Sequence, residues 1–236
     1  MLDAAAGRTT PVAEVLANAA HEMRAPLAVI QQALDLIEVD HADLSIAELL
    51  RCVRSARAGV HRLRVLADSV ASATPTGSFV VDTRPVELAA VIDECRGPLE
   101  LLLSARRQRL ESAPFRAGLR VIADDRLLPV VVWNLVLNAS KYGPQGAPIQ
   151  LTVREEDAVA RVIVEDRGTG IPPQNVPAVF ERYYRGDAPR SIEGVGLGLA
   201  IAREIVDAHR GGMGIDSEVG RGTSVWFTLP LAPDES

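Results

Sequence analysis

The 236-residue sequence lacks the cysteine patterns and the basic excess that mark several large classes of protein. Its two cysteines, Cys52 and Cys95, show no CxxC spacing and no nearby histidine cluster, which argues against a disulfide framework and against a zinc site. We therefore expect two buried thiols in a reducing compartment. Because 31 acidic residues outnumber 25 basic ones and the net charge is -6, no nucleic-acid partner is expected.

Long apolar runs are also missing. A membrane-spanning helix needs roughly 18 apolar residues, whereas the longest uncharged stretch, 127–140, is shorter and contains Pro129, Asn134 and Asn138. The start of the chain, MLDAAAGRTTP, lacks the basic and apolar regions of a signal peptide. We expect no membrane contact in this chain and a cytoplasmic location, either alone or as the cytoplasmic portion of a larger membrane-bound receptor.

Hydrophobic residues make up 47% of the sequence, which is enough for stable cores. From Pro11 to about Asp40 the apolar residues follow helical spacing, with proline in the first turn. His21 lies about 140° around this helix from the apolar stripe, so its imidazole should point outward. Pro26 lacks the N–H that would bond to the Glu22 carbonyl, which predicts a bend beside His21. The stripe consists of Leu16, Met23, Ile30 and Ile37, with a second row of Ala20, Leu27 and Leu34.

A second helix is predicted from about Ile46 to Ala71. Its apolar residues alternate steps of four and three, which is the spacing of a coiled-coil seam. The two helices form a hairpin over residues 10–73, and a hairpin of this width has too little surface to bury both stripes. We therefore expect a homodimer in which two hairpins form a four-helix bundle. The seam consists of Leu49, Val53, Ala56, Val60, Leu63, Ala67 and Val70.

Residues 74–78, TPTGS, are typical of an interdomain linker, and the pattern changes after them. Residues 79–232 interleave helical and strand patterns and end in a hairpin, which predicts an α/β sandwich with a mixed sheet and helices on one face. The fold class of the whole chain is therefore α+β. Strand patterns cover 79–84, 119–123, 149–155, 158–166, 213–217 and 223–229; helical patterns cover 86–105, from a cap at Asp124 to about Tyr142, and 198–208.

Three polar clusters in this second part favour a phosphate ligand. Asn134 and Asn138 share a helix face with Lys141 a turn further on; amide oxygens suit magnesium and lysine suits phosphate, although asparagines near a helix end are often only structural. Asp166 ends an apolar strand in DRGTG, where it accepts a hydrogen bond from a ligand amine or simply forms a turn. The glycines of residues 194–200 open a helix and leave amides for phosphate, but they lack the context of a dinucleotide fingerprint.

Six motifs, taken in order, resemble those of sensor histidine kinases of two-component systems: HEMRAPL (21–27), NLVLNASKY (134–142), DRGTGI (166–171), FERYYR (180–185), GVGLGLAIA (194–202) and GRGTSVWFTLP (220–230). The resemblance implies that 10–73 is a dimerisation and phosphotransfer domain and that 79–232 is a catalytic ATP-binding domain of the Bergerat type. It implies an enzyme that uses ATP and Mg²⁺ to phosphorylate His21 and then passes the phosphoryl group to an aspartate of a response-regulator receiver domain.

The resemblance also implies a role for each matching residue. His21 would be the nucleophile and Glu22 would hold its other ring nitrogen. Arg182 or Arg185 would reach the γ-phosphate when a lid over residues 184–193 closes. The nucleotide site would consist of Asn138 and Asn134 as magnesium ligands, Lys141 near phosphate, Asp166 on the adenine amine, and further contacts from Tyr142, Gly168, Gly170, Gly194, Gly196, Leu197, Gly198 and Thr223.

Two residues depart from the family pattern. Ala25 stands where Thr or Asn is frequent, and a methyl group cannot orient the water that removes phosphate from a regulator, so we expect weak phosphatase activity. Val195 replaces a frequent Thr or Ser, with little effect expected because backbone amides bind the phosphate there.

Two other functions stay open. Free ATP hydrolysis would need a carboxylate base where Asn134 stands, and a non-catalytic scaffold would be expected to lack His21, Asn138 or Asp166. The remaining histidines, His41, His61 and His209, are interpreted as surface or structural residues, and a charged His209 would suit the end of its helix.

Overall fold

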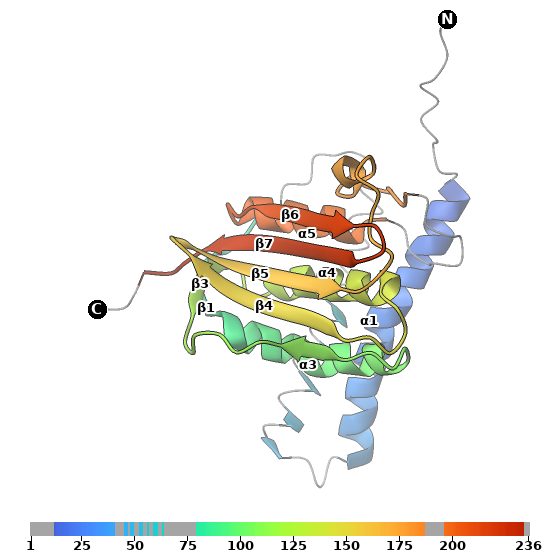
Figure 1. Cartoon of the computed structure of the whole chain (residues 1–236). Helices are drawn as coiled ribbons and strands as arrows, with labels where there is room; N and C mark the ends of the chain where they lie inside the picture. The colour runs from blue at the N-terminus through green and yellow to red at the C-terminus, as the bar shows by residue number, and fades with distance from the viewer. Residues whose placement is uncertain are drawn as a thin grey trace, which may run out of the picture.

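The computed structural model describes residues 12–40, 45–46, 48–49, 52–53, 56, 59–60, 63, 79–186 and 196–233; within 12–40 it describes the side chains of residues 23–24 and 26–38. One mixed sheet forms the front layer in Figure 1, helices lie behind it, and the long helix α1 (Val12–Asp40) runs alongside them. The helices behind the sheet are α3 (Leu88–Ser104), α4 (Leu128–Tyr142) and α5 (Gly198–Ala208).

The main sheet has five strands in the order β2-β4-β5-β7-β6. β2 pairs in parallel with β4, and the other neighbouring strands are antiparallel, so the predicted mixed sheet is confirmed. A separate antiparallel pair joins β1 to β3. The strands are β1 (Arg84–Glu87), β2 (Leu110–Ser112), β3 (Arg120–Ala123), β4 (Ile149–Glu156), β5 (Val159–Asp166), β6 (Met213–Glu218) and β7 (Gly222–Pro230), and a short 3-10 helix, η1, covers Val176–Ala178.

Alternation along the strands decides which face of the sheet the helices cover. Successive strand residues point to opposite faces, and in β5 the residues Ala160, Val162 and Val164 are at most 2% exposed. Arg161 and Glu165 lie on the other face, where Figure 1 shows no helix. The apolar alternation of the sequence therefore determines the buried face of the sheet.

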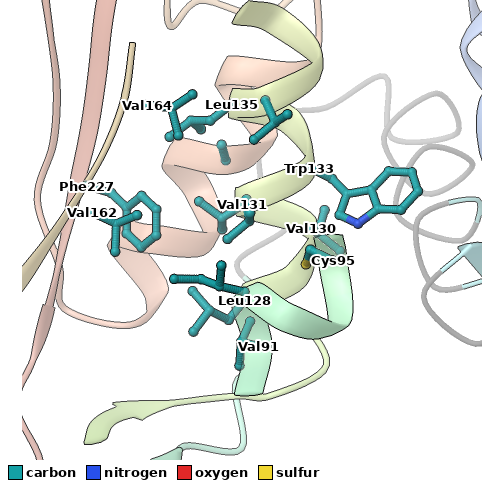
Figure 2. Packing of buried hydrophobic residues seen from close by; sticks show 14 of the residues in the cluster. Val91, Cys95, Leu128, Val130, Val131, Trp133, Leu135, Val162, Val164 and Phe227 are labelled. Carbon is teal, nitrogen blue, oxygen red and sulfur yellow. The ribbon is translucent and has the colours of Figure 1, made fainter. Parts of the chain in front are cut away.

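Helix α4 is buried on two opposite sides. Figure 2 shows Val131 and Leu135 on the side toward the sheet, where Phe227 points at the helix, whereas Trp133 points away from the sheet. Phe227 is fully buried and Trp133 is 2% exposed. Since both sides of α4 are packed, rotation of this helix would expose large apolar side chains.

Two details of the α/β domain differ from the sequence-based expectation. The strand predicted over 79–84 begins only at Arg84, because the Asp82 N–H donates to Asp124 Oδ2 (3.0 Å) rather than to a strand. Asp124 does not cap α4, which begins at Leu128. Its Oδ1 instead accepts from the Arg126 N–H (3.0 Å) and forms a turn before the helix.

The N-terminal helices pack differently from the predicted seam. α1 covers the predicted range with Pro26 inside it, and the described residues between 46 and 63, hereafter the return helix, are helical. Cys52 and Gly59 of the return helix are buried, whereas Leu49, Val53 and Val60 are at least 40% exposed. These three residues of the predicted seam therefore lie on an outer surface of this chain.

α1 divides its apolar residues between two surfaces. Val29 belongs to the same buried cluster as the core of the α/β domain, and Met23 packs against that cluster. Ala33 is also buried, whereas Leu27 and Leu34 are 45% and 48% exposed. α1 is therefore docked on the α/β domain through Met23 and Val29 and leaves Leu27 and Leu34 of its second apolar row exposed.

Both cysteines are buried free thiols, as the sequence predicted. Burial raises the pKa of the Cys95 thiol well above its usual range. The thiol is therefore neutral and suited to packing rather than to nucleophilic chemistry.

A buried polar contact joins the end of α5 to the turn before α4. The Asp124 N–H donates to His209 Nε2 (2.9 Å), and His209 Nδ1 lies 2.7 Å from the Ile205 carbonyl oxygen. Because Nε2 accepts, Nδ1 carries the proton and donates, so the imidazole is neutral. His209 is therefore a structural residue, one of the two roles expected from the sequence. It does not carry the positive charge that would suit the end of this helix.

The Asp124 carboxylate also has a shifted pKa. Burial acts to raise this pKa, but hydrogen bonds from the Arg126 side chain and from the Asp82 N–H outweigh it and hold the pKa well below its usual range. A depressed carboxyl pKa contributes stability that is complete above the ordinary aspartate pKa. That contribution is lost as the pH falls through the folded-state value.

Replacing His209 by Phe should destabilise the protein by about 2 kcal/mol, because the variant leaves the buried Asp124 N–H without an acceptor. Urea unfolding followed by tryptophan fluorescence measures the loss. Asp207→Asn, at an exposed residue of the same helix, is the control and should change stability by less than about 0.5 kcal/mol. Equal stability of His209→Phe and the native protein would contradict this role.

Candidate nucleotide site

The amide-bearing face of α4 meets the beginning of α5. Asn134 is 4% exposed, and its Oδ1 would lie 3.4 Å from a Cβ built on Gly198. The start of α5 therefore lies directly against the Asn134 amide. Asn138, one turn further along α4, is partly exposed. The fold thus brings two motifs that are far apart in the sequence to one place.

The turn after β5 packs against the C-terminal end of α4. Asp166 Oδ1 accepts a hydrogen bond from the Gly168 N–H at 2.7 Å. A Cβ on Gly168 would lie 2.5 Å from the Tyr142 carbonyl oxygen, and one on Gly143 would lie 3.5 Å from Asp166 Cβ. Glycine is required by this close approach at position 168, whereas the separation at position 143 is an ordinary contact. Asp166 and Tyr142 consequently belong to the same site.

The same turn is held from the other side by the β6–β7 hairpin. Gly170 has φ +71°, and a Cβ there would lie 2.1 Å from the Glu218 carbonyl oxygen. The Ile171 N–H donates to Ser217 Oγ (2.8 Å), and Ser217 Oγ lies 2.9 Å from Thr223 Oγ1. Thr223, predicted as a nucleotide contact, therefore also takes part in fixing the turn.

Burial raises the pKa of Asp166 above its ordinary value, although hydrogen bonds from the N–H groups of Gly168 and Thr223 oppose the shift. A partly buried carboxylate with unused oxygen lone pairs is a strong acceptor for a donor that enters the site. Protonation removes that property, and it sets in at a higher pH than for an exposed aspartate. Asp166 is thus suited to accept a hydrogen bond from an exocyclic amine.

The start of α5 joins the glycine motif to the segment before it. Gly196 has φ +75°, and a Cβ on it would lie 2.5 Å from the Tyr184 carbonyl oxygen. The Tyr183 N–H donates to the Gly196 carbonyl (2.9 Å). Among the described residues no side chain caps α5 at Leu197, so its first-turn amides and positive dipole end are available to an anion. The Leu197 side chain itself is fully buried, so any ligand contact would come from its backbone.

Arg182 is engaged by α5. Its Nε donates to Glu204 Oε1 (2.8 Å) and its Nη2 to Glu204 Oε2 (2.7 Å). The Arg203 guanidinium also lies 5.0 Å from the centre of the Phe180 ring. The FERYYR segment is therefore clamped to α5, and Arg182 would have to leave Glu204 to reach a phosphate. Its catalytic role and that of Arg185 stay predictions.

Several predicted residues lie outside the described residues. Gly194 and most of the predicted lid are among them, as are the side chains of His21 and Glu22, although the backbone of both residues is helical within α1. Lys141 is described, and its Nζ lies 5.6 Å from the centre of the Tyr142 ring.

The structure also identifies supporting residues that sequence reasoning missed. Gln108 is 5% exposed; its Nε2 donates to the carbonyls of Ser140 (3.2 Å) and Pro144 (3.0 Å), which anchors the end of α4. Ser217 and Glu204 have the comparable roles described above. Gln108, Glu204 and Ser217 each contact a segment far away in the sequence, and no local pattern marks these residues.

The arrangement fits a magnesium–nucleotide complex. The amide oxygens of Asn134 and Asn138 on α4 are candidate ligands for the metal; among the described residues no group of three His, Cys, Asp or Glu side chains could hold one. Mg²⁺ keeps several waters and binds through few protein oxygens together with phosphates. Asn134 and Asn138 beside an anion-attracting helix start satisfy that requirement.

This mixed sandwich is an ATP-binding domain of the histidine kinase type. Residues 123–233 match the family model described as histidine kinase-, DNA gyrase B- and HSP90-like ATPase. A solved structure titled "Mycobacterial sensor histidine kinase MprB" is 32% identical, with a TM-score of 0.56 over 64% of this chain and 99% of that one. The chain belongs to the sensor histidine kinase family.

Curated relatives extend this similarity over nearly the whole chain. The histidine-protein kinase/phosphatase MprB of Mycolicibacterium smegmatis is 33% identical over 98% of this chain and 48% of its own length. The sensor histidine kinase WalK of Bacillus subtilis is 31% identical over 94% of this chain and 37% of its own length. The chain thus spans about half the length of such relatives or less. None of its described helices has the length and hydropathy needed to span a bilayer.

Replacing Asp166 by Asn should weaken ATP binding roughly tenfold or more, since it removes a charged acceptor from a partly buried position. Titration with a fluorescent ATP analogue measures the affinity. Native affinity should also fall as the pH drops through the raised pKa of Asp166, a dependence that the variant lacks. Asp157→Asn, in an exposed turn with φ +49°, is the control. Unchanged affinity in Asp166→Asn would contradict the assignment.

Proposed function

We propose that this chain is the kinase core of a sensor histidine kinase, which transfers the γ-phosphoryl group of ATP to His21. The observation that carries the proposal is the contact between Asn134 of α4 and Gly198 of α5, with Asp166 at the adjoining end of β5. It gathers an amide ligand for magnesium, a phosphate-binding helix start and an acceptor for a base amine. Histidine supplies the acceptor nitrogen for the phosphoryl group.

In this proposal each residue binds, orients or moves a proton. Bound Mg²⁺–ATP supplies the phosphoryl group and charge neutralisation. Asn138, assisted by Asn134, would hold the metal, and Asp166 would hold the adenine amine. One nitrogen of His21 would attack the γ-phosphorus while the bond from that phosphorus to the β–γ bridging oxygen breaks and ADP leaves. Glu22 would bind the N–H of the other ring nitrogen, favour the nucleophilic tautomer and take up the ring proton as the phosphoryl group is gained. Phosphate contacts come from Lys141, Gly194, Gly196, Leu197, Gly198 and either Arg182 or Arg185, and Tyr142, Gly168, Gly170 and Thr223 line the base side.

The partners follow from the same chemistry. The phosphoryl group on His21 passes to an aspartate of a response-regulator receiver domain, which would dock on the hairpin around His21. A second copy of the chain would cover the exposed row of Leu27 and Leu34 together with the outer residues of the return helix. The exposure of these apolar side chains supports the predicted dimeric four-helix bundle. A stable monomer at micromolar concentration would contradict the dimer. The chain would act in the cytoplasm, as part of a membrane-bound receptor if it belongs to a longer protein.

Incubation with γ-labelled ATP and magnesium should place acid-labile, base-stable label on the native protein and none on His21→Gln, because only a nitrogen-bound phosphoryl group has that lability. His61→Gln is the matched control and should retain the label. Label that survives His21→Gln would reject His21 as the acceptor.

Phosphatase activity toward a phosphorylated regulator should be weak in this chain, although its mycobacterial relative is named a kinase/phosphatase. Ala25 offers no group to orient water, so Ala25→Thr should raise the dephosphorylation rate on the order of tenfold or more. Ala28→Thr, at an exposed position of α1, is the control. Rapid dephosphorylation by the ADP-bound native protein would contradict this expectation.

A further inference from the structure

Gly59 lies inside the return helix, at a position where that helix packs closely against α1. Gly59 and Val60 are both helical, and glycine is among the least favourable residues in a helix interior. A Cβ built on Gly59 would lie 2.7 Å from Ile30 Cγ1 and 2.9 Å from the Pro26 carbonyl oxygen. By contrast, Gly97 inside α3 has no atom within 4 Å of its built Cβ. Gly59 therefore marks a place where two helices touch without a side chain between them.

Small residues continue this contact along the return helix. Cys52, Ala56 and Gly59 follow one another at steps of four and three, so they share one helix face. The return helix meets α1 at Pro26 and Ile30 and therefore runs back along it, which brings Cys52 toward Ala33. Both of these residues are buried, at 7% and 6% exposure. The close approach at Gly59 thus belongs to one continuous helix–helix surface.

The contact lies at the turn of α1 that follows His21. Pro26 has no N–H for the Glu22 carbonyl, so the helix is weakest between these two residues. Gly59 touches the carbonyl of Pro26, on the C-terminal side of that weak point. Met23 on its N-terminal side and Val29 beyond it both pack on the α/β domain. The turn is consequently held between the return helix and the domain that binds the nucleotide.

We propose that Gly59 is a positioning residue for phosphoryl transfer: its missing side chain seats the return helix against the Pro26 turn and so sets where His21 stands relative to the nucleotide. This inference rests on the proposed function. A methyl group at Gly59 needs room that Ile30 Cγ1 and a backbone carbonyl occupy. The two helices must then separate at the turn beside His21, and a small displacement of a reacting group has a large effect on rate.

The test measures autophosphorylation of the full chain as a function of ATP concentration. Gly59→Ala should lower kcat on the order of tenfold or more and leave the KM for ATP unchanged, because the nucleotide site is not touched. Gly97→Ala is the matched control and should leave both constants unchanged. Combining Gly59→Ala with Ile30→Ala should restore part of the lost kcat, because it removes one of the two clashing groups.

The outcomes separate this inference from the proposed function. A native protein that takes no label on His21 rejects the proposed function, whereas a labelled native protein with an equal kcat in Gly59→Ala rejects only the role of Gly59. A raised KM, or additive effects of the two substitutions, also rejects it. Sedimentation velocity of each variant completes the test. If Gly59→Ala loses kcat while it remains a dimer, the positioning role is supported. If kcat is lost only because the dimer dissociates, the positioning role is rejected.

Discussion

The packing of α4 between two apolar surfaces holds the nucleotide site together. Val131 and Leu135 face the sheet, Trp133 points the other way, and neither side is open to water. Because the helix cannot turn without exposing these side chains, the direction of Asn134 and Asn138 is determined by the core. The same helix ends against the Asp166 turn, where Gln108 donates to the Ser140 carbonyl of the helix and to the Pro144 carbonyl that follows it. The burial of the apolar side chains of α4 therefore also determines the geometry of the candidate ligands on this helix.

Several segments of the fold also approach one another closely through glycine residues. Glycines at 168, 170 and 196 let backbone groups of different segments meet within the site, and Gly59 has the same effect between the N-terminal helices. In each case a neighbouring carbonyl oxygen occupies the space of a side chain, and at Gly59 an aliphatic side chain does so as well. A side chain at these positions would separate the elements that have to cooperate.

Much of the secondary structure could be predicted because its signals are local. α5 has the predicted bounds of Gly198 and Ala208, and β4 and β5 surround the predicted turn at Asp157. β2 escaped prediction because its three residues have no alternation of their own and are ordered by pairing with β4. Asp124 was read as a helix cap because aspartate before an apolar run favours one, but contacts with Asp82, Arg126 and His209 place it in a turn.

The sequence by itself determined the sandwich, the faces of its strands and helices and the residues of the six motifs, since periodicity and glycine spacing act over a few residues. Only the tertiary structure decided that α1 docks through Met23 and Val29, that Arg182 is bound by Glu204, and that Cys52 and Gly59 rather than Leu49 and Val53 lie in the buried part of the return helix. These outcomes depend on which apolar surfaces meet and on ion pairs between distant segments. Such contacts exist only after the chain has folded, so no local pattern encodes them.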